Sequence, residues 1–77
     1  MYAFIQKNGI LIKCYDMGDD WMTMDSLGNE RWRSQWQADK QASAFAAIQQ
    51  HAYDCLGVYV KADEITLCKG FPTESNS

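Results

Sequence analysis

The sequence lacks long apolar runs, glycine-rich loops and paired cysteines. No apolar run approaches the roughly 20 residues that cross a bilayer. Residues 1–6 also lack the basic leader and apolar stretch of a signal peptide, so we expect no membrane segment. The five glycines are isolated, which gives no support to phosphate binding. No catalytic or cofactor motif rises above background, and the predicted cofactor set is therefore empty.

The three cysteines, Cys14, Cys55 and Cys68, are odd in number and form no CxxC pair. They indicate reduced, mostly buried thiols in a cytoplasmic protein. Cys55 follows His51 by one helical turn and could join another cysteine in a zinc set. The ligands would come from scattered elements, however, so no metal site is predicted. Catalysis by a Cys55–His51 pair is disfavoured because Cys55 lies at the C-terminal end of the predicted helix, where the helix dipole raises a thiol pKa.

The size and charge of the chain predict one small globular domain. Its 77 residues are 47% hydrophobic and include three tryptophans, four tyrosines and three phenylalanines. Large aromatics compensate for the small core that so short a chain can bury. We expect a single domain over residues 1–72 and a polar tail over 73–77. The net charge of −3 argues against a nucleic-acid surface and is compatible with a protein partner.

The spacing of apolar residues switches once from strand to helix. Four runs with a period near 2 predict an antiparallel meander over residues 2–6, 10–16, 21–25 and 30–37. Asn8-Gly9 is a strong hairpin signal between the first two runs. Asp39 is a plausible N-cap for a helix that ends at the C-cap glycine, Gly57. We predict an α+β fold: a four- to five-stranded antiparallel sheet with one α-helix (about 39–56) packed on one face, followed by a short C-terminal strand at 64–68.

The predicted helix carries an apolar stripe that should face the sheet. The stripe consists of Ala42, Phe45, Ile48, Ala52 and Leu56. The residues expected to face water are Ser43, Ala47, Gln50 and Asp54.

Alternation in the fourth run separates its tryptophans from its arginines. Trp32 and Trp36 are expected to pack under the helix, which leaves Arg31 and Arg33 on the other, open face. The predicted partner-binding surface on that face comprises Arg31, Arg33, Gln35, Trp21, Tyr15 and Lys13. Aromatic and arginine side chains are enriched at protein–protein hot spots. A register slip of one residue would invert these faces.

These features predict a non-enzymatic binding or modulator protein that acts through protein–protein contacts. A phage or mobile-element accessory protein or inhibitor is one concrete form of such a protein. One alternative is a small-ligand-binding or enzymatic domain with a pocket near His51, Cys55 and Tyr59. The other is a homodimeric structural module that uses the open face or a strand edge for itself.

Overall fold

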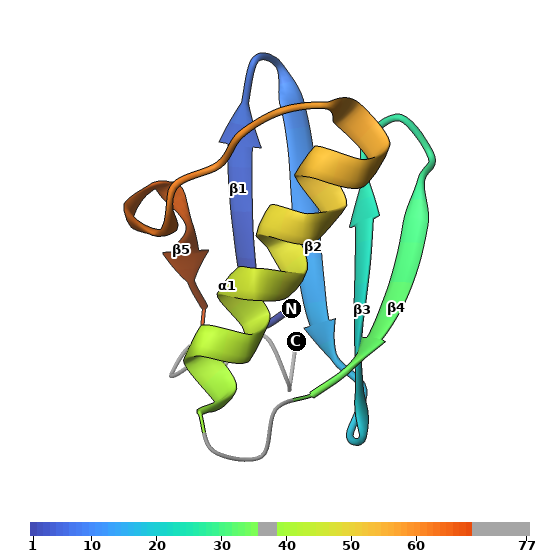
Figure 1. The fold of residues 1–77 in the computed structure, drawn as a ribbon, viewed down its shortest axis with the longest axis vertical. Coiled ribbons are helices and arrows are strands. Elements are labelled where there is room, and N and C mark those ends of the chain that lie inside the picture. Colours follow the sequence, from blue (N-terminus) through green and yellow to red (C-terminus); the bar gives the residue numbers. More distant parts are fainter. Residues whose placement is uncertain (36–38, 69–77) are drawn as a thin grey trace.

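A computed structural model describes residues 1–35 and 39–68 of the chain. In these residues five strands form an antiparallel sheet in the order β4-β3-β2-β1-β5, and helix α1 crosses one face of it (Figure 1). The elements are β1 Ala3–Lys7, β2 Ile10–Asp16, β3 Asp20–Asp25, β4 Glu30–Ser34, α1 Lys40–His51 and β5 Thr66–Leu67. The predicted α+β architecture is confirmed, including the short C-terminal strand, which pairs with β1.

Local sequence signals set the turns and the helix ends. Asn8 and Gly9 both have positive φ, 54° and 75°, as the tight turn between β1 and β2 requires. The Asp39 side chain accepts a hydrogen bond from the Ala42 amide at 3.1 Å and so caps α1. The helix continues as a π-helical turn, Ala52–Leu56, and ends at Gly57 with φ 67°. The predicted hairpin and both caps are therefore confirmed.

Trp21 lies at the centre of the core between α1 and the sheet. Its side chain is fully buried, and its ring meets the Tyr2 ring edge-on with centroids 4.9 Å apart. The indole Nε1 donates a 2.7 Å hydrogen bond to Ser43 Oγ on α1. The other buried apolar residues are Ala3, Ile5, Ile12, Cys14, Ala44, Ala47, Ile48, Ala52, Val60, Ile65 and Cys68.

The predicted sides of the sheet are wrong for β3 and β4. Trp32 is 54% exposed, whereas Trp21 is buried under the helix. Trp21 pairs with Arg33 and Met22 pairs with Trp32, so the arginines share the helix-covered face with Trp21. Alternation grouped these side chains correctly, but it cannot say which group the helix covers. Trp36 and the proposed tail at 73–77 lie outside the described residues.

The predicted helix stripe is also partly wrong. Ile48 and Ala52 are buried as expected, but Ser43 and Ala47 are buried too. Phe45 and Leu56 pack only partly against the core. Small side chains on the buried face let the helix backbone come close to a sheet that already carries the large Trp21 ring. The centre of the buried stripe therefore lies closer to Ser43 and Ala47 than the apolar pattern predicts.

Candidate functional site

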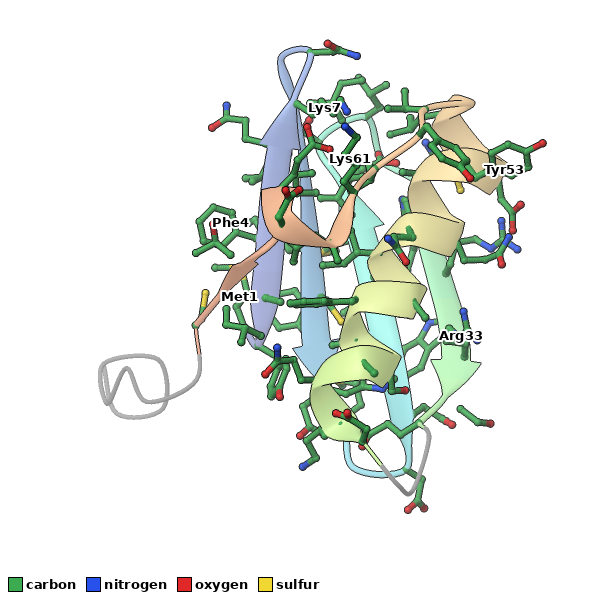
Figure 2. The ribbon with its side chains drawn as sticks, turned by 60° about the vertical axis from the view of Figure 1, so that its left-hand side comes forward. Met1, Phe4, Lys7, Arg33, Tyr53 and Lys61 are labelled. Atoms are coloured by element: carbon green, nitrogen blue, oxygen red, sulfur yellow. The ribbon has the colours of Figure 1, made fainter. Side chains whose placement is uncertain are left out.

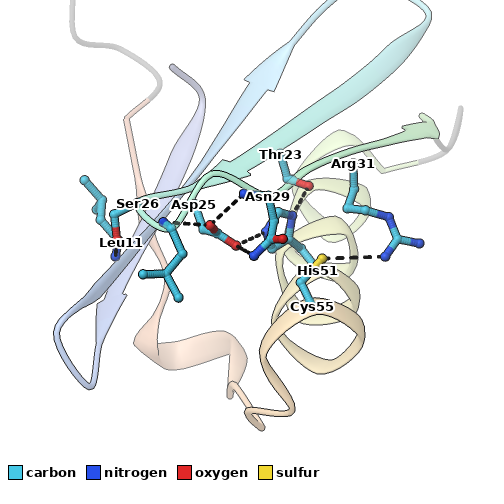
Figure 3. Close-up of polar contacts among 9 residues, drawn as sticks. Leu11, Thr23, Asp25, Ser26, Asn29, Arg31, His51 and Cys55 are labelled. Atoms are coloured by element: carbon cyan, nitrogen blue, oxygen red, sulfur yellow. Dashed lines mark hydrogen bonds and ion pairs between the residues drawn. The ribbon is translucent and has the colours of Figure 1, made fainter.

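A buried polar cluster joins α1 to β3 (Figure 3). His51 Nδ1 lies 2.7 Å from Thr23 Oγ1, and His51 Nε2 lies 2.8 Å from Asp25 Oδ2. Asn29, which follows β3, donates from its side-chain amide to Asp25 Oδ2 at 2.9 Å. The exposed fractions of Thr23, Asp25 and His51 are 3%, 8% and 1%. We call these four residues the His51 cluster.

The charge state of Asp25 fixes the direction of the hydrogen bonds in the His51 cluster. Burial acts to raise the Asp25 pKa, but hydrogen bonds from His51, Asn29 and Leu27 outweigh it and lower the pKa to about 2. The carboxylate is thus ionised at neutral pH and can only accept, so His51 Nε2 must donate to it. In a neutral imidazole Nδ1 then accepts, and the Thr23 hydroxyl donates to it.

Acid should weaken the fold through Asp25. Its folded pKa of about 2 lies below the ordinary value of 3.8, so the unfolded chain binds the proton more tightly. The resulting stabilisation, about 2 kcal/mol, is present above pH 4 and is lost as the pH falls towards 2. Urea unfolding measured between pH 5 and pH 2 should show this loss. The Asp25→Asn variant should show a shallower fall, and an equally steep fall would assign the acid sensitivity to other groups.

The geometry of the His51 cluster suits a structural role better than a catalytic one. A hydroxyl, an imidazole and a carboxylate in a row can pass a proton along the chain Thr23–His51–Asp25. However, both His51 nitrogens are already engaged, and the Thr23 hydroxyl lies beneath α1 with almost no exposed surface. We therefore interpret the cluster as a polar clamp between helix and sheet. One sequence pattern points to this clamp: His51 follows the small residues Ala47 and Ser43 by four and eight positions, on the same helix face.

A small pocket of about 270 Å³ opens between β4 and α1, next to the His51 cluster. Two guanidinium groups border it. Arg31 Nη2 lies 3.6 Å from Asp54 Oδ2, and Arg33 Nη1 donates to the Ala46 carbonyl at 3.4 Å. Figure 2 shows Arg33 beside the helix. The lining residues are Thr23, Arg31, Trp32, Arg33, Ala47, Gln50, His51 and Asp54.

The residues predicted to form one binding surface are divided between two faces. Trp21 is in the core, and Arg31 and Arg33 lie beside the pocket on the helix side. Gln35 lies at the end of β4, where its side-chain amide donates to Asp16 Oδ1 at 2.6 Å. The prediction that Trp21 and the arginines form an exposed patch on an uncovered face is therefore wrong.

Lys13 and Tyr15 do lie on the face of the sheet that α1 does not cover. We call this the open face. Two rows of side chains cross it, because register places Tyr15 opposite Met22 and Met22 opposite Trp32, and Lys13 opposite both Phe4 and Met24. Phe4 points away from the helix in Figure 2. The open face includes Phe4, Gln6, Leu11, Lys13, Tyr15, Asp20, Met22, Met24, Glu30, Trp32 and Ser34.

The thiols do not gather around His51. Cys14 is buried, and burial raises its pKa to about 12. Cys55 Sγ accepts from Arg31 Nη1 at 3.6 Å, while the two His51 nitrogens contact Thr23 and Asp25. Tyr59 borders a separate pocket with Tyr53, Gln49 and Val60, so His51 and Tyr59 do not line the same pocket. Within residues 1–35 and 39–68, no three His, Cys, Asp or Glu side chains are placed to hold a metal ion.

Comparison with known proteins adds no relative. No family model, no curated protein and no solved structure matches the chain. None of the helices in the described part of the chain combines the length and apolar character needed to cross a bilayer. The function must therefore be argued from the geometry of the open face, the pocket and the His51 cluster.

Proposed function

We propose that this protein is a non-enzymatic binding module that docks its open face against a partner protein. The observation that carries the proposal is the row formed by Tyr15, Met22 and Trp32 across three neighbouring strands. Trp32 is 54% exposed at the end of this row. No helix or strand among the described residues covers the face (Figure 1).

The chemistry of the open face suits a protein partner. Tryptophan, tyrosine, phenylalanine and methionine are enriched at protein interfaces, and methionine adapts its shape to the opposing surface. Lys13 and Glu30 border the apolar rows and supply charges of both signs. The pocket beside His51, about 270 Å³, is smaller than the roughly 300–1,000 Å³ of typical small-molecule sites, and the larger hollow beside Tyr53 and Tyr59, about 620 Å³, is more open to solvent. The open face is thus the better-supported binding surface.

The proposal extends to the setting in which the protein acts. The three cysteines are thiols, which fits a reducing, cytoplasmic compartment. The net charge of −3 favours a protein over a nucleic acid as the partner. An accessory protein or inhibitor of a phage or mobile element, which acts by covering a surface of its target, would have this form.

Capture from a lysate of the native host tests the proposal with two variants of equal charge change. Met22→Lys places a cation in the middle of the open face and should reduce capture of the partner at least about tenfold. Gln41→Lys places the same cation on the exposed side of α1 and should leave capture unchanged. Circular dichroism of both variants checks that each is folded.

Capture by the wild type and by the two variants distinguishes the possible outcomes. Capture by the wild type that Met22→Lys abolishes and Gln41→Lys preserves supports the open face. Equal capture by all three forms, or no capture by the wild type, contradicts the proposal. A captured protein that is a second copy of this chain would replace the partner by a homodimer, which sedimentation of the purified protein would show.

A further inference from the structure

Strand β4 forms one edge of the sheet. The strand order places β3 on one side of it, and no described strand lies on the other. Such an edge presents a row of backbone donors and acceptors that can pair with another chain. The residues of β4 alternate in side: Arg31 and Arg33 face the helix and the pocket, while Trp32 faces away from the helix.

Hydrogen bonds at the two ends of β4 identify which backbone groups point outward. The Asp25 amide donates to the Asn29 carbonyl at 3.0 Å, and the Gln35 amide donates to the Asp19 carbonyl at 3.2 Å. Hydrogen-bonded and non-hydrogen-bonded pairs alternate along an antiparallel ladder. The backbone groups of Arg31 and Arg33 therefore point towards β3, and those of Glu30, Trp32 and Ser34 point outward.

This alternation of inward- and outward-pointing backbone groups decides which residues of an added antiparallel strand would form hydrogen bonds with β4. Its residues opposite Glu30, Trp32 and Ser34 would exchange backbone hydrogen bonds. Its residues opposite Arg31 and Arg33 would stand in the non-hydrogen-bonded positions, where side chains approach most closely. The chemistry of the added strand is therefore set at those two positions, and the two arginines favour carboxylates there.

A second copy of this chain fits the edge poorly. When the β4 strands of two copies pair antiparallel about a twofold axis, residues that stand opposite one another have their side chains on the same face of the sheet. Within Glu30–Ser34, each such register that pairs three or more residues puts Arg31 or Arg33 directly opposite an arginine of the other copy. Like charges directly opposite are destabilising. The same two arginines that repel a second copy would attract an acidic strand.

We propose that the edge of β4 takes an extended acidic segment of the partner protein as a further antiparallel strand. Two of its carboxylates lie against Arg31 and Arg33, and the residue between them packs on Trp32. This inference rests on the proposed function and names the chemistry of the partner. Strand addition of this kind obtains affinity from the backbone and specificity from alternate side chains.

The acidic groups next to Arg31 compete only weakly with a carboxylate of an added strand. The Arg31–Asp54 pair is loose at 3.6 Å, and its side chains are 51% and 32% exposed, so it contributes little. Glu30 is on the opposite face, where its carboxylate accepts from Trp32 Nε1 at 2.8 Å. The chain's net charge of −3 opposes an acidic strand only weakly, because exposed charges farther than about 8 Å from the edge are largely screened.

The test uses blocked peptides of about seven residues, the length of an ordinary strand, in which valine and glutamate alternate. The wild-type protein should bind this peptide at least about tenfold more tightly than the peptide with lysine in place of glutamate. The double variant Arg31→Glu with Arg33→Glu should reverse the preference. The control Lys61→Glu, on the exposed segment before β5, should keep it. Isothermal titration calorimetry measures each affinity.

Methylated peptides test strand pairing without any variant of the protein. Valine amides should point at β4 and glutamate amides away from it. N-methylation of the valines should therefore abolish binding, whereas N-methylation of the glutamates should leave most of it.

Equal binding of the acidic and basic peptides, no binding of either, or equal effects of the two methylations overturns the proposal; the arginines then only guard the edge against self-association. If the peptides fail while Met22→Lys still abolishes capture, only this inference fails; if Met22→Lys leaves capture unchanged, the docking of the open face fails regardless of the peptides.

Discussion

Replacing Trp21 by alanine should remove a large part of the stability of the fold. Truncation of a fully buried tryptophan costs about 3–5 kcal/mol. A domain of 77 residues has roughly 4–12 kcal/mol in total. The change also removes the edge-on contact with Tyr2 and leaves Ser43 Oγ without its indole donor. We expect the Tm to fall by about 15 °C or more, measured by thermal unfolding followed by circular dichroism.

Trp32→Ala is the matched control for this prediction. Trp32 has the same side chain on the adjacent strand, but it is 54% exposed and its Nε1 contacts only the nearby Glu30 carboxylate among the contacts described. The expected loss is below about 1 kcal/mol. If Trp32→Ala costs as much as Trp21→Ala, both tryptophans are buried and the assignment of faces to β3 and β4 is wrong.

Replacing His51 by leucine should be comparably damaging, for an electrostatic reason. The variant keeps an apolar side chain on α1 but leaves the buried Asp25 carboxylate without its imidazole donor and Thr23 without its partner. Leaving a buried charged acceptor without one of its donors costs about 3 kcal/mol. Urea unfolding at pH 7 measures the loss.

A double-mutant cycle shows whether the loss comes from the charge. In the Asp25→Asn background no carboxylate is left unpaired, so His51→Leu should cost less there by at least about 1 kcal/mol. Equal costs in both backgrounds would mean that the Asp25 charge contributes nothing to the stabilisation by His51. In that case the His51 cluster would not be the polar clamp described above.

The sequence predicted the parts of this fold that depend on neighbouring residues. The hairpin at Asn8-Gly9 follows from the tolerance of both residues for positive φ. The helix cap at Asp39 and the stop at Gly57 follow from local backbone chemistry. These signals act within a few residues, so one sequence is enough to read them.

The sequence could not predict which side of the sheet the helix covers. Period 2 divides β4 into two sets, but hydropathy then favours tryptophan inside and arginine outside. At a sheet edge the preference is reversed here, because the arginine stems lie beside α1 while their charged groups border an open pocket. The buried polar residues are equally hidden from hydropathy, since Thr23 and His51 satisfy one another across 28 residues of sequence.

For the same reason, only part of the candidate binding surface could be predicted from the sequence. Lys13 and Tyr15 were predicted on the open face and lie on it, while Trp21 belongs to the core. Arg31 and Arg33 remain of interest, although at the edge of the sheet rather than on its face. Met22 and Trp32 were missed as surface residues because apolar side chains on alternating strands normally indicate a core.

The central claim is that the partner docks on the open face and the adjoining edge of β4. The most direct measurement is a map of backbone amide chemical shifts on the labelled protein as the captured partner is added. The account predicts the largest changes at Tyr15, Met22 and Trp32, with smaller ones on the outer side of α1. Changes concentrated instead at Tyr53 and Tyr59, on the helix side of the molecule, would contradict it.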